Sequence, residues 1–217
     1  MTNDGDSLNA LLGLLNVWER TLLPSGCIWG LPLTIYPPSL GWMHPRSVAA
    51  PRRRVDFPSW SWTGWAGEVS IDALLLPGNA TGARICDPVR DMSVAYVGVT
   101  GKELTVEAWA VALEICTEPF SEVFVPGTSE TLMGMVVERN FLHPNTLPSG
   151  TYRCLVVERV TYRIRADGPI FQKVFMIVLD GDGVTRPAQR RTIITLSTVA
   201  GGDFMCVGPL RRRVTLM

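Results

Sequence analysis

Acid–base chemistry in this sequence could depend on only two imidazoles, His44 and His143, because the chain contains no other histidine. A serine or cysteine nucleophile would have to lie within hydrogen-bond reach of one of these rings. Ser59 and Ser61 could approach one in space, but no G-x-S-x-G sequence presents a serine as a nucleophile. We therefore expect His44 to make a structural hydrogen bond and His143 to lie in a loop. The sequence predicts no catalytic residue, and a hydrolase built on either histidine is a minor alternative.

Residues 180–183 read DGDG, which matches the first positions of a calcium-binding loop. Such a loop also needs an oxygen ligand at its fifth position, glycine at its sixth and glutamate at its twelfth. Those positions hold Val184, Thr185 and Arg191, so the segment is predicted to be a turn between two strands. The five cysteines form no C-x-x-C pair, and no glycine-rich phosphate loop occurs. The sequence predicts neither a metal site nor a cofactor.

Aromatic residues are concentrated in residues 57–67, which read FPSWSWTGWAG and hold Trp60, Trp62 and Trp65. An indole buries a large apolar area and carries one N–H that needs an acceptor when it is buried. Three indoles this close together predict either an anchor for a core or a platform on which a ligand stacks. In an extended segment Trp60 and Trp62 share a face, whereas Trp65 follows Gly64 and can turn elsewhere. We therefore favour the anchor, with a ligand-binding module as the alternative.

Arginines close to these indoles could add charge to a binding platform. Arg52, Arg53 and Arg54 form an uninterrupted run just before the aromatic segment, and further runs occur at residues 190–191 and 211–213. Such runs more often lie on a solvated or carboxylate-paired strand edge than at a phosphate site. The candidate residues for a structural motif or a binding platform are Trp29, Trp42, Trp60, Trp62, Trp65, Arg52, Arg53 and Arg54.

The elements that must position these residues change in type along the chain. Residues 6–22 carry apolar side chains at three- and four-residue spacing, which predicts an amphipathic helix. Residues 28–58 are rich in proline, tryptophan and glycine and predict a long irregular segment. After Gly67 the composition and the turn signals predict strands. The predicted strands are residues 94–99, 104–115, 122–125, 132–138, 151–165, 170–179, 191–197 and 204–207.

This order of elements predicts an α+β, mainly β, fold. We expect an N-terminal helix and a Trp/Pro-rich segment packed on an antiparallel β sandwich or open barrel. The lead-in segment spans residues 1–67 and the β-rich domain residues 68–217, and the two are expected to form one compact unit. Residues 174–179 read VFMIVL, and such a continuous apolar run predicts a strand that is buried on both faces.

Composition and charge restrict the setting of the protein. Hydrophobic residues make up 47% of the 217 residues and charged residues 18%, which suits a folded domain. Lys plus Arg equals Asp plus Glu, at 20 each, so no net charge attracts the chain to nucleic acid or to an anionic membrane. No uncharged apolar run is long enough to span a bilayer, and the polar N-terminus is no secretory signal. Scattered cysteines favour a reducing compartment, and we expect a cytoplasmic location.

Several short motifs occur in a recognisable order. DSLNA begins at residue 6, WGLP occupies residues 29–32, SLGW residues 39–42, RRR residues 52–54 and FPSWSWTGW residues 57–65. This succession resembles the region downstream of the HET domain in fungal heterokaryon-incompatibility proteins, where a D-A-L-N-A-type helix, a W-G-L-P step and a P-S-W-S-W-A-G-W motif follow one another. The resemblance covers residues 4 to about 69, with Thr63 in place of the usual alanine. The strand-rich remainder looks only loosely like the variable C-terminal part of such proteins.

The resemblance implies a role in non-self recognition and programmed cell death, because family proteins are implicated in cell death after fusion of genetically unlike hyphae. The HET domain is taken as the death effector and carries L-S-Y-x-W-G and I-D-x-L-C-I-x-Q segments, neither of which occurs in this sequence. None of its functional residues can therefore be assigned here. The resemblance implies a non-catalytic accessory or regulatory region, or a shortened family member, whose partners are other HET-family or signalling proteins.

Overall fold

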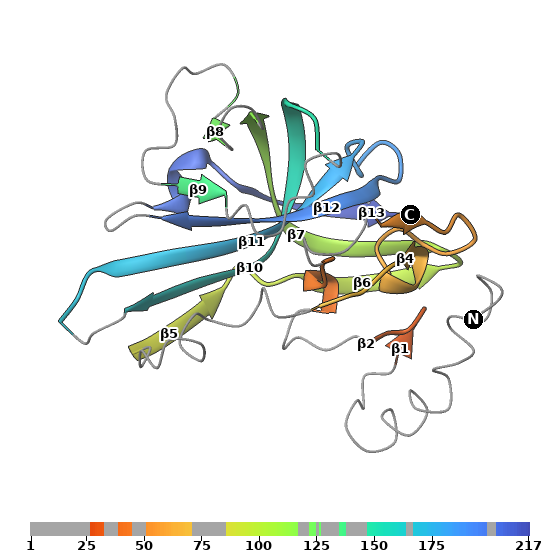
Figure 1. The fold of residues 1–217 in the computed structure, drawn as a ribbon, viewed down its shortest axis with the longest axis horizontal. Helices are drawn as coiled ribbons and strands as arrows, with labels where there is room; N and C mark the ends of the chain where they lie inside the picture. Colours follow the sequence, from red (N-terminus) through yellow and green to blue (C-terminus); the bar gives the residue numbers. More distant parts are fainter. Residues whose placement is uncertain are drawn as a thin grey trace.

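The described part of the chain is built mainly from β-strands and short 3-10 turns (Figure 1). The computed structural model describes residues 27–32, 39–44, 51–70, 86–116, 122–124, 126, 135–137, 147–163, 167–198 and 203–217. The helix predicted over residues 6–22 and the loop predicted around His143 lie outside these residues.

One antiparallel sheet of nine strands forms the body of the protein. Its main path runs in the order β13-β7-β10-β11-β12-β9, with β5 paired to β10 and with β6 and β8 paired to β7. The strands are β5 (Cys86–Asp91), β6 (Ala95–Thr100), β7 (Glu103–Cys116), β8 (Glu122–Phe124), β9 (Met135–Val137), β10 (Gly150–Arg163), β11 (Ile170–Asp180), β12 (Gln189–Thr198) and β13 (Leu210–Leu216). The path has two ends in the described part of the chain, so the sheet is open. The predicted mainly β, antiparallel fold is confirmed.

Both faces of the sheet are apolar. Successive side chains of a strand point to opposite sides, so a continuous apolar run places apolar side chains on each face. Between Val174 and Leu179 of β11, the odd-numbered side chains belong to one buried cluster and the even-numbered ones to a second. None of these side chains is more than 2% exposed. The prediction that this strand is buried on both faces is therefore confirmed.

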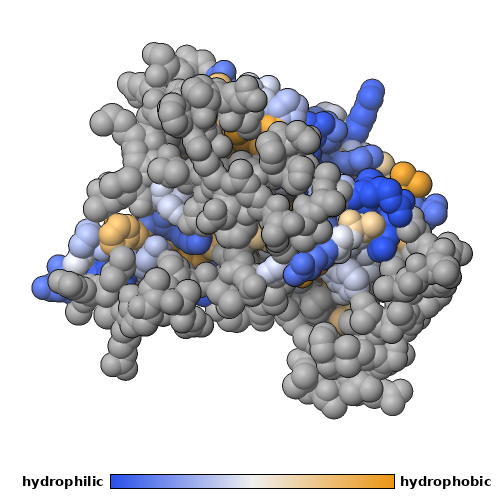
Figure 2. Space-filling view, in the orientation of Figure 1, coloured by the Kyte–Doolittle hydropathy of each residue, from blue (hydrophilic) through white to orange (hydrophobic). Residues whose placement is uncertain are grey.

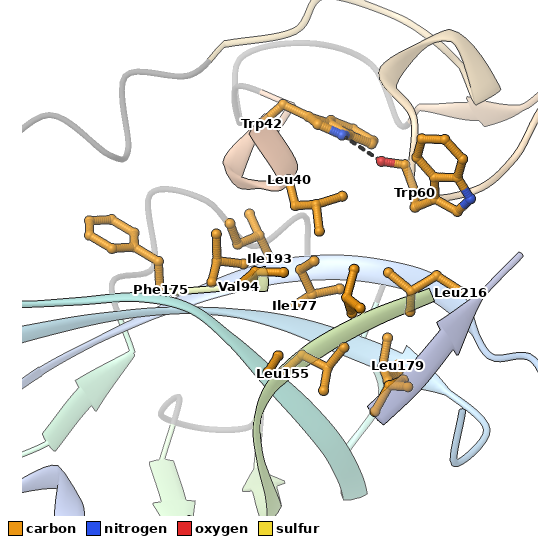
Figure 3. Packing of buried hydrophobic residues seen from close by; sticks show 14 of the residues in the cluster. Leu40, Trp42, Trp60, Val94, Leu155, Phe175, Ile177, Leu179, Ile193 and Leu216 are labelled. Atoms are coloured by element: carbon orange, nitrogen blue, oxygen red, sulfur yellow. Dashed lines mark hydrogen bonds between the residues drawn. The ribbon is translucent and has the colours of Figure 1, made fainter. Parts of the chain in front are cut away.

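Short elements from the first part of the chain cover one face of the sheet. They are β1 (Cys27–Ile28), β2 (Leu31–Pro32), η1 (Ser39–Gly41), β3 (Arg52–Arg53), η2 (Trp62–Gly64) and β4 (Trp65–Ala66). Leu40, Trp42 and Trp60 share a buried cluster with Ile177 and Leu216 of the sheet (Figure 3). The described part of the Trp/Pro-rich segment thus packs on the sheet, as expected. It contains short paired strands and is more regular than predicted, while the boundary between residues 1–67 and 68–217 stays a prediction.

A 3-10 turn covers the opposite face. Both apolar ends of η5 (Phe204–Val207) lie in the second buried cluster. Residues 204–207 were predicted as a strand, and that prediction is wrong. The Asp203 carboxylate caps the turn by accepting the Met205 N–H at 3.0 Å, and Gly208 ends it in the left-handed region at φ 64°. A short polar residue before the turn and a glycine after it are the usual signals for a helical turn.

Two strands of the sheet were not predicted, β5 and β13. A proline interrupts the pattern of β5 and an arginine run that of β13, so neither has the apolar alternation that marks a strand. Arg211 and Arg213 of β13 both reach the Glu107 carboxylate of β7, at 3.8 and 3.0 Å. The C-terminal arginine run is therefore a carboxylate-paired strand edge, the arrangement that the sequence favoured.

Candidate functional site

The five tryptophans from Trp29 to Trp65 gather on one face of the sheet, and we call Trp29, Trp42, Trp60, Trp62 and Trp65 the tryptophan cluster. Each indole donates its N–H to a main-chain oxygen: Trp29 to Gly101 at 2.9 Å, Trp42 to Trp60 at 2.9 Å, Trp60 to Lys102 at 2.9 Å, Trp62 to Gly30 at 2.8 Å and Trp65 to Ser59 at 2.8 Å. Two of the acceptors, Gly101 and Lys102, lie in the turn between β6 and β7. The cluster therefore fastens the first part of the chain to the sheet.

Burial differs among the five indoles. Trp60 is 0% exposed and Trp42 3%, whereas Trp29, Trp62 and Trp65 are half-buried at the edge of the cluster. Figure 3 shows Trp42 and Trp60 side by side above the sheet, joined by their hydrogen bond. A stacking platform needs exposed ring faces and free polar edges. Because each of these five indole N–H groups already has a partner within the chain, the geometry favours the anchor.

The arginine run before the aromatic segment is divided between two roles. Arg53 lies under the loop that follows: its Nη1 donates to Gly64 O at 2.7 Å and also to Arg54 O, and its Nη2 donates to Phe57 O at 2.5 Å. Burial lowers the pKa of Arg53. Arg54 Nη1 donates to Thr63 O at 3.3 Å, whereas the Arg52 side chain is exposed. Two of the three arginines therefore hold the loop through its main-chain oxygens.

Gly64 lies where the loop packs tightly against its own main chain at Pro58. A Cβ atom at this position would lie far inside contact distance of the Pro58 carbonyl oxygen and 2.8 Å from Arg53 Nη1. A main-chain oxygen cannot move aside as the end of a flexible side chain can. Only glycine therefore fits at the third position of the W-T-G-W sequence, because any Cβ atom there would overlap its neighbours.

Arg190 at the start of β12 is a buried cation, 3% exposed. Its guanidinium lies 3.6 Å from the centroid of the Trp42 ring, its Nη1 donates to Leu40 O at 2.7 Å, and its Nη2 donates to Trp42 O. None of the described residues supplies a carboxylate to it. Burial therefore lowers the pKa of Arg190 to about 9. A cation–π contact and carbonyl dipoles replace the counter-ion.

Serine hydroxyls of the P-S-W-S-W sequence are used as structural hydrogen-bonding groups. Ser59 Oγ donates to the main-chain oxygen of Met217 and accepts the Arg190 N–H at 2.9 Å. Ser61 Oγ donates to Trp29 O at 2.6 Å. His44 Nδ1 bonds Glu68 O at 2.6 Å. Neither serine is therefore paired with His44, and a Ser–His nucleophile–base pair is not formed there.

The DGDG segment is a hairpin turn. β11 and β12 pair antiparallel up to Asp180↔Gln189, and Asp182 accepts the N–H groups of Val184 and Thr185 at 2.9 and 3.0 Å. The Thr185 hydroxyl also donates to Asp182, at 2.6 Å, and this bond, together with the main-chain N–H groups, holds the pKa of Asp182 well below its usual range. Within the part of the chain that the structure describes, no three His, Cys, Asp or Glu residues gather closely enough to hold a metal ion.

Arg190 and the Lys102 turn are the members of the site that sequence reasoning missed. Arg190 was grouped with Arg191 as surface charge, and no local pattern distinguishes the buried arginine from its neighbour. Arg191 is 34% exposed and lies 3.6 Å from Asp180. The pairing of β12 with β11 shifts here, because Val178 pairs with Thr192 and Leu179 with Arg190, so that Arg191 is an extra residue in the strand. This irregularity places Arg190 on the sheet face that η1 covers.

The surface seen in Figure 2 is mixed in character. Hydrophilic residues gather at its upper right, where Figure 1 places the ends of β12 and β13, and hydrophobic residues form small separate areas. Among the described residues, no helix has the length and apolar character required to cross a membrane.

Comparison with protein-family models, with curated proteins and with solved structures gives no match to this chain. The resemblance to the region downstream of the HET domain therefore depends on the ordered motifs alone.

Proposed function

We propose that this chain is a non-catalytic accessory or regulatory region of a fungal heterokaryon-incompatibility-like protein. In this proposal it acts in the cytoplasm, in non-self recognition and programmed cell death, next to an effector domain that it holds or restrains. Its partners are other HET-family or signalling proteins, and it binds neither nucleic acid nor a cofactor.

One observation carries the proposal. The P-S-W-S-W-T-G-W sequence, which gives the resemblance its specificity, is used as a packing unit in which each of its three indole N–H groups bonds a main-chain oxygen. The most distinctive residues of the chain thus maintain its shape. A region whose characteristic motif maintains shape suits a scaffold that presents surfaces to other domains.

The alternative, a ligand-binding module with a tryptophan platform, has weaker support because Trp42 and Trp60 are buried. Acrylamide quenching of tryptophan fluorescence separates the two. Buried indoles emit at short wavelength and resist the quencher, while a platform emits at long wavelength and is quenched readily. Addition of oligosaccharides or single-stranded nucleic acid should leave the emission unchanged.

The function itself can be tested in a filamentous fungus. The chain is expressed alone, and it is also expressed joined downstream of a HET domain, and hyphal death is scored with a vital dye after fusion with a compatible strain. We expect no death from the chain alone and a changed death frequency when it is joined to the effector.

The matched variants are Trp60→Ala, which removes a fully buried indole, and Arg212→Gln, which changes an exposed side chain. The first should abolish the effect on the effector and the second should preserve it. Death caused by the isolated chain, or an effector that behaves identically with and without the chain, would contradict the proposal.

A further inference from the structure

His44 lies in a confined position at the edge of the tryptophan cluster. Its ring makes edge contacts with Trp42 and Trp65, at centroid distances of 5.5 and 6.0 Å. The adjacent Met43 forms an isolated antiparallel bridge with Ser70, with N···O distances of 2.7 and 2.8 Å in the two directions. The imidazole, which bonds Glu68 O, thus adds a side-chain contact to the pairing between residues 42–44 and 68–70.

The hydrogen bonds of the ring define its protonation. Glu68 O can only accept, so His44 Nδ1 carries a hydrogen in the 2.6 Å bond between them. His44 Nε2 is buried and has no partner among the described residues. In the neutral ring Nε2 is an unpaired acceptor, whereas in the imidazolium it would become a buried donor without an acceptor. The second state is the more costly one, because it also places a charge in the cluster.

The charged groups around this ring reinforce the neutral form. Arg190 of β12 stacks on Trp42, the ring that His44 also contacts, and its charge opposes a second cation. Arg53 of β3 lies over Trp65, the second ring that His44 contacts, 5.7 Å from its centroid. Glu68 offers its main-chain oxygen to Nδ1, and this bond favours the charged ring. Burial, opposed by this bond and reinforced by Arg190, lowers the pKa of His44 below 6.5.

We propose that His44 is an acid-sensitive latch. The neutral ring holds residues 68–70 on residues 42–44, and protonation drives the ring out between Trp42 and Trp65 into water, which opens this pairing and uncovers the edge of the tryptophan cluster. The device is independent of the proposed function, since it depends on the fold of this chain alone.

The direction of the pH effect follows from linkage. The closed state binds a proton less readily than the open state, in which the ring has its ordinary pKa of 6.5. The neutral ring's contribution to the stability of the closed state is therefore fully present above pH 6.5. That contribution is lost progressively as the pH falls below 6.5. One proton changes the opening equilibrium by at most about tenfold per pH unit.

Amide hydrogen exchange of the whole chain between pH 7.5 and 5 tests the latch. The Ser70 N–H, which bonds Met43 O at 2.8 Å, reports the opening directly. After correction for intrinsic exchange rates, we expect its opening constant to rise several-fold between pH 6.5 and 5, while the Leu155 and Ile177 amides in the sheet stay constant. The matched variant is His44→Asn, whose side-chain amide can donate to Glu68 O but does not titrate in this range, and it should remove the pH dependence.

A second measurement applies if His44→Asn fails to fold. The imidazole C–H resonances of the wild-type chain are titrated by NMR, and His143→Asn identifies which signal belongs to His44. A titration midpoint clearly below 6.5, accompanied by line changes at Trp42 and Trp65, supports the latch. A midpoint at or above 6.5, or the same pH dependence of Ser70 exchange in wild type and His44→Asn, overturns it.

Discussion

The guanidinium carbon of Arg190 lies over the indole of Trp42 in the interior of the protein, 3.6 Å from the ring centroid, and its two terminal nitrogens donate to the Leu40 and Trp42 carbonyl oxygens. Through Arg190, β12 thereby holds η1 and Trp42 against the sheet. Because this arrangement needs a planar cation with divergent donors, a lysine ammonium cannot provide it.

Arg190→Lys tests this requirement. The lysine ammonium cannot stack flat on Trp42 and reach both carbonyl oxygens, so an acceptor is left without its donor in the interior. We expect the free energy of unfolding to fall by about 1–3 kcal/mol. Urea denaturation measures it, with Arg191→Lys as the control, because that neighbouring side chain is 34% exposed. Equal stability of the two variants would show that the stacked geometry contributes nothing.

The positions of Trp60 and Trp62 predict unequal costs of truncation. Trp60 is 0% exposed and its N–H bonds Lys102 O, so Trp60→Ala should cost about 3–5 kcal/mol of unfolding free energy. Trp62→Ala should cost clearly less, since part of that indole lies in water. Thermal unfolding of both variants provides the comparison. A larger loss for Trp62→Ala would mean that the edge of the cluster stabilises the fold more than its buried centre.

Gly64 and Gly98 differ in the space that a Cβ atom would find, so they allow a controlled comparison. A Cβ at Gly64 would collide with the Pro58 carbonyl oxygen, whereas a Cβ at Gly98 in β6 meets nothing within 4 Å. Gly64→Ala should therefore lower the free energy of unfolding by about 1–3 kcal/mol or more. Gly98→Ala should change it by less than about 0.5 kcal/mol. Denaturant midpoints measure both, and a tolerated Gly64→Ala would require the loop to adopt another path.

Cys154 and Cys206 should differ in thiol reactivity. Cys154 is fully buried in β10, where the lack of solvation raises the pKa of its thiol to about 12, while Cys206 is exposed in η5. The thiolate is the reactive form. At pH 8 a maleimide should label Cys206 within minutes and Cys154 only after unfolding, as read by peptide mass spectrometry. Cys206→Ser identifies the fast site, and rapid labelling of native Cys154 would contradict the described packing.

Sequence patterns predicted the sheet well because its central strands obey simple rules. The apolar run of β11 and the turn residues around it required no knowledge of distant contacts. The strand β13 was missed because three arginines replace the apolar alternation, and Glu107, which pairs with two of them, lies 106 residues away from Arg213. Residues 204–207 were assigned as a strand from their composition, although Asp203 and Gly208 carry the capping signals of a short helical turn.

The candidate site could be predicted only in part. The closeness of Trp60, Trp62 and Trp65 indicated an anchor, but the carbonyl groups that accept their N–H groups belong to residues with no side-chain signal, such as Lys102. The burial of Arg190 depends on η1 covering β12, a contact across 150 residues. Local spacing contains no information on such contacts.

Ser59 bonds a main-chain oxygen that lies 158 residues further along the chain. A ribosome adding about 5–20 residues per second makes Met217 roughly 8–32 s after Ser59. During that interval the aromatic segment has left the exit tunnel without the strand end on which it finally rests. We therefore expect newly made chains to expose this segment until Met217 has been made, so that the speed of translation should affect the yield of folded protein.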